Sequence, residues 1–395
     1  MRSVLAVLVA VLAALPHQAQ AGGPAVFNDS GRIMKWPLTS GPVTMRLDQG
    51  GLGRLSKTEA DDLVARARDV WTAVPESAVA LGLDATQLAD DVTSANYETF
   101  LGWFTLNGFN PIIYDADGGI IEDLFGAGAS NRMLGFTDLV YREEPATTAV
   151  LEVRIVLNGR FLDGISSGGL NREVTAPEFH GVLVHELGHA LGLDHAQINA
   201  MDPDNTNQPT MFPLFYGGEA MGSLGQDDIG WIAHLYPDEA AGALGAISGE
   251  VRLTTPTGTR GYQGLNVLAR RIDGTAAQAG SCVSGYLFRA GKGPLSLAGT
   301  YLIPGLPPGE YRVEVEEVLD VFIGASSVGP LDPPEDFPEP AGPEAYNGPW
   351  ESADDRPEDI TPVEVVAGRE TEEIDIVLNT GGAVSLRAPQ WSLYR

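Results

Sequence analysis

The stretch that decides the fold is 185–195, which reads His-Glu-Leu-Gly-His-Ala-Leu-Gly-Leu-Asp-His. On a helix, His185 and His189 share one face because they are four residues apart, so both rings can bind one metal ion. Gly192 permits the left-handed backbone that ends a helix, and the resulting turn can return His195 as a third ligand. Three nitrogen ligands leave one coordination position open, which is typical of a catalytic zinc rather than a structural one.

Glu186 stands beside the first ligand and is the expected general base, which takes a proton from a metal-activated water. The alternative is a chance pair of histidines on a solvated helix face, which the in-register Gly192 and His195 disfavour. The helix has its own start signal. Thr175 and Glu178 are spaced as a capping box at its N-terminus.

The length and the first residues indicate an exported protein of two domains. A chain of 395 residues exceeds one typical domain. Residues 1–21 have the pattern of a secretory signal peptide, with Arg2, an apolar run over 4–15 and a small-residue cleavage site at 19–21. A membrane anchor is the alternative, but the run is short for a bilayer span. We therefore expect a secreted, extracellular or periplasmic location with no membrane span.

Charge and cysteine content restrict the partners and the means of stabilisation. The formal net charge of −29 argues against nucleic acid as a partner, because phosphate binding requires a basic surface. Cys282 is the single cysteine, so no intramolecular disulfide can form. We expect Cys282 to be a small buried residue of a β-strand.

The residues after the signal peptide predict an α+β domain over 36–238, preceded by a short leader over 22–35. A mixed sheet is expected from strands at 43–48, 110–115, 133–141 and 149–157, where apolar and β-branched residues recur. Three helices are expected: one capped by Ser56 and Glu59, the metal-binding helix, and a last helix over 226–236.

The remainder of the chain predicts an all-β sandwich over 246–380 after a linker at 239–245. Short strands at regular spacing with Gly and Pro turns carry this expectation. They fall at 247–253, 265–271, 286–289, 301–304, 311–317, 363–366 and 373–378. Residues 324–360 are acidic and Pro-rich and are expected to form a long loop, and 381–395 form a tail.

The extended histidine motif resembles that of the metzincin zinc proteases, and the matrixins are the most similar subgroup. Metzincins have a methionine-containing turn beneath the metal, for which Met211 is our candidate and Met201 the rival. Pro213 stands where astacins and serralysins carry a tyrosine, and Asp227-Asp228-Ile resembles the last matrixin helix. The resemblance implies a metzincin-type fold with a mixed twisted sheet, one catalytic Zn²⁺, and a protein or peptide substrate.

The resemblance also implies where the substrate binds. The edge strand near 133–140 is expected to hold an extended substrate through main-chain hydrogen bonds. The loop between Met211 and Gln226 is expected to shape the pocket for the residue after the cut. Its apolar side chains suggest an apolar preference: Phe212, Leu214, Phe215 and Tyr216.

Several departures from the matrixin pattern limit the comparison. No cysteine precedes the metal motif, so cysteine-based latency cannot operate, and the leader is short for a prodomain. His180 and His234 are isolated, so a second, structural zinc is not expected.

Calcium is a separate expectation that rests on a cluster of carboxylates around Gly118-Gly119. Hard carboxylate ligands on a flexible backbone suit Ca²⁺, and the cluster comprises Asp115, Asp117, Glu122 and Asp123. The alternative is a solvated Asp/Gly turn.

The C-terminal domain is similar to carboxypeptidase regulatory-like, or transthyretin-like, sandwiches. The similarity rests on Ile247–Val251, Gly264–Ala269 and Gly305–Val313. It predicts a fold and no chemistry. A rival hypothesis is therefore an exported surface-binding or adhesion protein with a vestigial or stabilising zinc site, which an intact Glu186 disfavours. A non-peptidase amide hydrolase is a third hypothesis, and the oligomeric state is not determined by these patterns.

Overall fold

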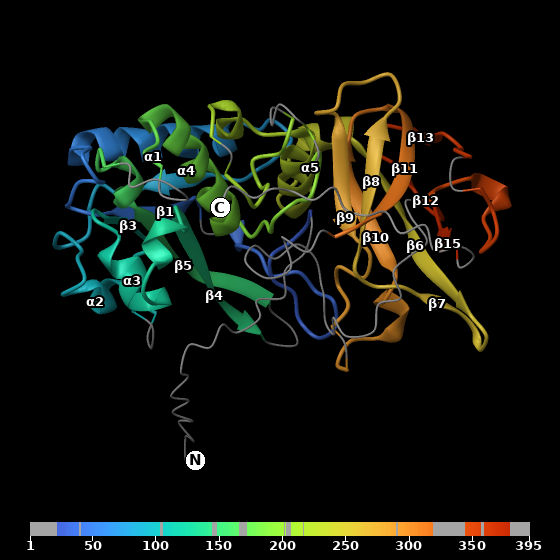
Figure 1. The fold of residues 1–395 in the computed structure, drawn as a ribbon, viewed down its shortest axis with the longest axis horizontal. Helices are drawn as coiled ribbons and strands as arrows, with labels where there is room; N and C mark the ends of the chain where they lie inside the picture. The colour runs from blue at the N-terminus through green and yellow to red at the C-terminus, as the bar shows by residue number, and fades with distance from the viewer. Residues whose placement is uncertain are drawn as a thin grey trace, which may run out of the picture.

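The structure is a computed structural model with an α+β unit and an all-β unit side by side (Figure 1). It describes residues 22–38, 41–102, 106–143, 148–165, 172–200, 202, 207–215, 217–289, 291–318, 344–356 and 359–379. The expected signal peptide and tail, Met201 and Tyr216 lie outside these ranges. Among the described residues, no helix combines the length and the apolar character needed to cross a membrane.

The first unit contains a five-stranded mixed sheet in the order β2-β1-β3-β5-β4. Strands β1, β2, β3 and β5 run parallel, and β4 pairs antiparallel with β5 at the edge. The strands are β1 (Val43–Leu47), β2 (Leu81–Leu83), β3 (Pro111–Asp115), β4 (Gly135–Glu143) and β5 (Thr148–Asn158). Four of them overlap the expected strands. The edge position of β4 leaves one side of its backbone without a strand partner in the described chain.

Helices α1 (Lys57–Thr72), α4 (Ala176–Ala190) and α5 (Gln226–Leu235) agree with the three expected helices. Both expected capping boxes are present, with Ser56 and Glu59 on α1 and Thr175 and Glu178 on α4. Two further short helices were not predicted, α2 (Tyr97–Leu101) and α3 (Gly119–Phe125). At five and seven residues they are too short for a clear helical period in the sequence.

The second unit contains two sheets. The first has the order β10-β6-β14 with β7 and β15 also on β6, and the second has the order β12-β11-β8-β9 with β13 on β11. The strands are β6 (Gly245–Thr255), β7 (Gly258–Gly261), β8 (Leu265–Arg271), β9 (Ala279–Val283), β10 (Thr300–Leu306), β11 (Gly309–Glu317), β12 (Glu344–Ala345), β13 (Val363–Val365), β14 (Glu370–Thr371) and β15 (Ile376–Leu378). Cys282 is buried in β9, as expected.

Three expectations for this half require correction. Residues 286–289 form a turn and not a strand, because the chain leaves β9 through Ser284 and the left-handed Gly285 (φ 71°). The linker expected at 239–245 ends one residue earlier, since β6 starts at Gly245, and Glu239–Ala243 of this linker form a 3₁₀ helix. The expected loop 324–360 contains β12, whose residues pair with β11 and are buried.

The two units share one buried interface, in which α5 lies against β9 and β10 (Figure 1). Gly230 of α5 contacts the sandwich so closely that a Cβ there would lie 2.5 Å from the Pro304 carbonyl oxygen. The leader also packs into the molecule, with Phe27 and Met34 at most 2% exposed. A single apolar cluster therefore runs from the α+β unit into the sandwich.

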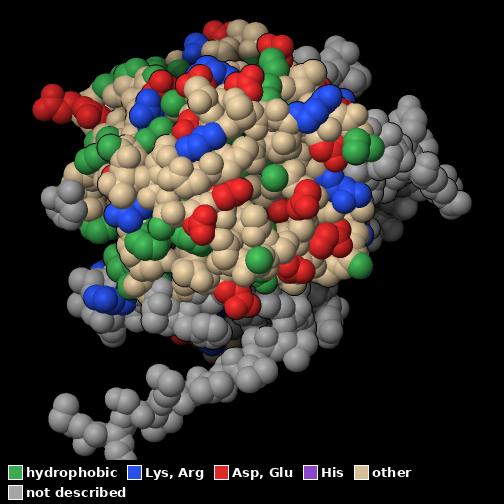
Figure 2. Space-filling view, turned by 90° about the vertical axis from the view of Figure 1, so that its left-hand side faces the viewer, with side chains coloured by type: hydrophobic (Ala, Val, Ile, Leu, Met, Phe, Trp, Pro, Cys, Tyr) green, Lys and Arg blue, Asp and Glu red, His purple; other side chains and the backbone are tan. Residues whose placement is uncertain are grey.

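The exposed surface reflects the composition. Figure 2 shows Asp and Glu side chains scattered over one end of the molecule, with Lys and Arg between them. This face presents no continuous basic region, in agreement with the charge of −29.

Candidate metal centre

The three predicted histidines converge on one point. The Nε2 atom of His189 lies 3.0 Å from Nε2 of His185 and 3.1 Å from Nε2 of His195. Tetrahedral zinc at its usual bond length separates nitrogen ligands by roughly 3.3 Å, so the three rings fit this ion. Within the described residues this is the one group of three or more His, Cys, Asp or Glu side chains with ligand atoms within 4.8 Å of one another.

Backbone carbonyls orient two of the rings through their other nitrogen. His185 Nδ1 lies 2.8 Å from Thr210 O, and His189 Nδ1 lies 2.8 Å from Leu193 O. A carbonyl only accepts hydrogen bonds, so each Nδ1 carries the proton and each Nε2 keeps a lone pair for the metal. Burial lowers the pKa of His185 to about 4 and that of His189 well below its ordinary value, so both rings are neutral ligands at pH 7.

The chain turns at the end of α4 so that His195 lies beside His185 and His189, as the sequence predicted. Gly192 is in the left-handed conformation, with φ 91°. The Gly192 amide donates to His189 O at 2.8 Å and the Leu193 amide donates to Gly188 O at 3.1 Å. This pair of bonds is a Schellman motif, which closes the helix and redirects the chain toward His195.

Met211 lies directly beneath α4, in the position expected of the methionine turn. It is 2% exposed, and its sulfur is so close to the helix that a Cβ on Gly188 would lie 2.3 Å from it. The Met211 carbonyl accepts from the Ala196 amide at 2.9 Å, which ties the turn to the residue after the third ligand. An apolar floor of this kind restrains the ligands without binding the metal.

Asp228 fixes the same turn from α5, a role that sequence reasoning did not assign. Its carboxylate accepts from the backbone amides of Thr210 (2.8 Å), Met211 (3.1 Å) and Gly225 (2.7 Å). Burial raises its pKa to about 6 despite these donors. The Asp227-Asp228 pair in the sequence is a signal that could have identified Asp228. Its hydrogen-bond partners at Thr210 and Met211 become its neighbours only in the fold.

Glu186 points toward β4 and is 5% exposed. The Thr137 hydroxyl lies 2.7 Å from its Oε2 and 3.0 Å from its backbone oxygen. Gly135 makes room for the carboxylate, since a Cβ there would lie 3.1 Å from Glu186 Oε1. Burial raises the pKa of Glu186 to about 7. Thr137 was part of the expected substrate strand but had no predicted role at the base.

The loop after the methionine turn differs from the expected apolar pocket wall. Phe212 is 1% exposed and packs with Met221, Val283 and Val318, the last two from the sandwich side. Leu214 and Phe215 pack against the same cluster. These side chains therefore contribute first to the interface between the two units.

The four carboxylates proposed for calcium are mostly engaged in local backbone capping. Asp115 accepts from the Ile121 amide at 2.9 Å, and Asp117 accepts from the Gly119 amide at 3.0 Å. Glu122 accepts from Gly128 and Ser130, while Asp123 is exposed on α3. The four carboxylates do not converge on one point, and calcium binding stays a prediction.

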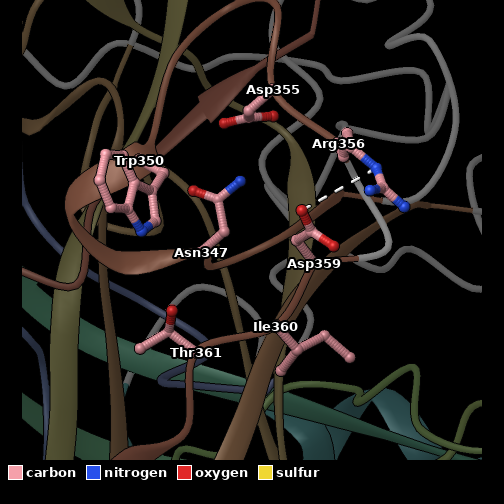
Figure 3. A pocket seen from close by; sticks show the side chains of 7 residues that line it. All are labelled: Asn347, Trp350, Asp355, Arg356, Asp359, Ile360 and Thr361. Atoms are coloured by element: carbon pink, nitrogen blue, oxygen red, sulfur yellow. Dashed lines mark ion pairs between the residues drawn. The ribbon is translucent and has the colours of Figure 1, made fainter.

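Figure 3 shows a pocket in the second unit, built from residues that follow the histidine motif by more than 150 positions. It is lined by Asn347, Trp350, Asp355, Arg356, Asp359, Ile360 and Thr361. Arg356 and Asp359 form an ion pair across it at 3.9 Å.

Three histidines with an adjacent buried glutamate define the kind of metal centre that metallohydrolases use. Residues 148–237 match the family model described as Matrixin. A segment of 76 residues is 37% identical to Metalloendoproteinase 5-MMP of Arabidopsis thaliana and covers 18% of this chain and 19% of that protein. Over residues 148–237 the N-terminal unit is therefore similar to the matrixins, which agrees with the resemblance carried by the motif. The chain spans about a fifth of the length of that relative.

Proposed function

We propose that the protein is a zinc endopeptidase that hydrolyses protein or peptide substrates. The observation that carries the proposal is the convergence of three histidine Nε2 atoms in the fold, with the buried Glu186 next to one of these histidines in the sequence. Bound zinc supplies Lewis acidity, which polarises a carbonyl group and acidifies water. The Matrixin match over 148–237 supports the same chemistry.

Glu186 is the proposed general base and then the general acid. It takes the proton of the attacking water and delivers it to the leaving amine. The raised pKa of Glu186 suits a group that must both accept and release a proton near neutral pH. Thr137 positions the carboxylate by donating to Oε2 at 2.7 Å.

The proposed substrate site is the free edge of β4. This strand ends the sheet and contacts α4, the helix that carries Glu186. An extended peptide can add to such an edge through main-chain hydrogen bonds, so that its scissile bond faces the metal centre.

Cleavage of an unstructured protein by the chain beginning at Gly22 tests the proposal. Glu186→Gln should retain zinc and lose nearly all turnover. Glu178→Gln is the matched control, because it makes the same chemical change on the same helix and glutamine still satisfies a capping box. Equal cleavage by Glu186→Gln and the wild type would remove Glu186 from the mechanism. Cleavage that persists after chelation would remove the metal.

We also propose that the protein is exported, on the basis of the signal-peptide pattern in residues 1–21. Expression of the full chain in a bacterium, followed by N-terminal sequencing of the secreted or periplasmic product, tests this. The expected product begins at Gly22. A cytoplasmic product that retains Met1 would contradict export.

A further inference from the structure

We propose that the sandwich is a working part of the metal centre and that its residue Asn266 positions the third ligand, His195. This inference rests on the proposed zinc site and assigns a role to a domain that carries no catalytic group of its own. His185 and His189 are held by a rigid helix. His195 instead follows the helix end, so the loop around it must be located by other contacts.

The first contact is a buried polar network on the residue two positions after His195. Asn266 of β8 donates from Nδ2 to the Gln197 backbone oxygen at 2.6 Å and to Glu316 Oε1 at 2.9 Å. Gln197 Nε2 donates in turn to Glu316 Oε1 at 2.9 Å and to Glu317 O at 2.9 Å. Asn266 and Gln197 are at most 1% exposed. Water cannot replace these partners easily, so the loop has one well-defined position.

The second contact extends the attachment along the same loop. Ile198 is buried in a small cluster with Leu268 and Ala279 of the sandwich. Arg270 donates from Nη1 to Asn199 Oδ1 at 2.6 Å. Three successive residues after Ala196 thus each contact the second unit.

The third contact reaches the opposite side of the metal centre. The Ser281 amide donates to Asp227 Oδ1 at 2.6 Å, and Trp231 Nε1 donates to Ser281 O at 3.0 Å. The next residue, Asp228, holds the Met211 amide. The sandwich therefore fixes both the loop of the third ligand and the helix that clamps the methionine turn.

This arrangement differs from simple domain docking in what it predicts for metal binding. If the contacts only joined two independent domains, weakening one would lower stability and leave the metal affinity of the folded protein unchanged. If Asn266 positions His195, its loss should weaken zinc binding in protein that is still folded, because one ligand is displaced.

Asn266→Leu in the full chain tests the inference. It removes the donor to Gln197 O and keeps the branched shape and the number of side-chain heavy atoms. Gln263→Leu is the matched control, since Gln263 is also a buried amide that donates to two carbonyls, those of Gly285 and Phe288, both within the sandwich. Zinc affinity is measured by competition with a chromophoric chelator, and Co²⁺ is titrated for its visible spectrum. We expect Asn266→Leu to weaken zinc binding on the order of tenfold and to alter the Co²⁺ spectrum. Gln263→Leu should do neither.

A second pair of variants keeps the test decisive if Asn266→Leu does not fold. Arg270 and Arg312 both pair with Glu314 at 2.9 Å, but Arg270 also donates to Asn199 in the α+β unit. Arg270→Met should weaken zinc binding to a smaller extent than Asn266→Leu, and Arg312→Met should leave it unchanged. Wild-type zinc affinity and Co²⁺ spectra in Arg270→Met and in folded Asn266→Leu would overturn the inference. Because these readouts need no substrate, they are independent of whether the protein proves to be a peptidase.

Discussion

Gly188→Ala tests whether the methionine turn and α4 are in contact beneath the metal. An alanine Cβ would lie 2.3 Å from Met211 Sδ and 2.8 Å from Trp71 Cζ2. The methionine sulfur is near the end of a flexible chain and can shift. The Trp71 ring cannot, because it is fully buried and its Nε1 donates to Val184 O at 2.8 Å. The added methyl group must therefore displace the helix or Met211.

The expected magnitude follows from two opposed effects. Overpacking of a buried site typically destabilises by about 1–3 kcal/mol. Replacing glycine with alanine inside a helix stabilises by about 1 kcal/mol. The free energy of unfolding should fall by about 0–2 kcal/mol, where an unobstructed site would gain about 1 kcal/mol. Zinc affinity should fall on the order of tenfold, because Met211 adjoins Thr210, whose carbonyl orients His185.

Urea unfolding of the metal-free protein and chelator competition for zinc measure both quantities. Gly181→Ala is the comparison on the same helix, where a Cβ would meet Met221 Cβ at 3.1 Å and not Met211. Because Met221 reaches the metal centre only through the Thr210 hydroxyl, Gly181→Ala should weaken zinc binding less than Gly188→Ala. A Gly188→Ala protein that is more stable by about 1 kcal/mol and binds zinc normally would refute the reasoning.

Three further outcomes follow from the same geometry. Gly192→Ala should lower the free energy of unfolding by about 1–2 kcal/mol, because φ at this position is 91° and alanine is strained there. Urea unfolding measures the loss, and an unchanged free energy of unfolding would mean that the helix ends in another conformation. Burial, with smaller contributions from Asp355 and Glu351, raises the pKa of Glu344 to about 7, so the folded state retains a proton that the unfolded state has lost. The contribution of Glu344 to the stability of the metal-free protein should therefore grow as the pH falls from about 7 toward 5. Glu344→Gln should remove this contribution from the pH dependence of the free energy of unfolding, and an unchanged pH dependence would place the titrating group elsewhere. Chelation should lower the melting temperature, and zinc at a hundred times its Kd should raise the free energy of unfolding by about 2.7 kcal/mol. A melting temperature that does not depend on zinc would contradict binding to the folded state.

Local signals in the sequence predicted the helix that carries the metal site. The capping box of Thr175 and Glu178, the four-residue spacing of His185 and His189, and Gly192 at the helix end all act within a few residues. Such signals are readable because their physical effect depends on neighbouring positions. Local signals also predicted α1 and, to within about two residues, the ends of most strands in the α+β unit.

Short elements escaped prediction because their stability comes from packing. Helix α3 begins after the left-handed Gly118 and buries Ile120 and Ile121, yet seven residues give no clear period. Strand β12 has two residues and exists because it pairs with β11 inside an acidic, Pro-rich stretch. The turn at 286–289 was read as a strand because its residues are apolar; Tyr286 and Phe288 are indeed buried, but without strand partners.

By itself, the sequence determined which residues are the candidate ligands, the candidate base and the candidate methionine of the turn, since each lies in or near one short motif. Only the tertiary structure decided what holds them in place. Thr137 reaches Glu186 across 49 residues, and Asn266 reaches Gln197 across 69. Contacts at such separations produce no periodic pattern, because they depend on where the whole chain folds back on itself. The sequence could therefore predict the candidate metal centre, while only the fold shows that the loop after His195 contacts the second unit.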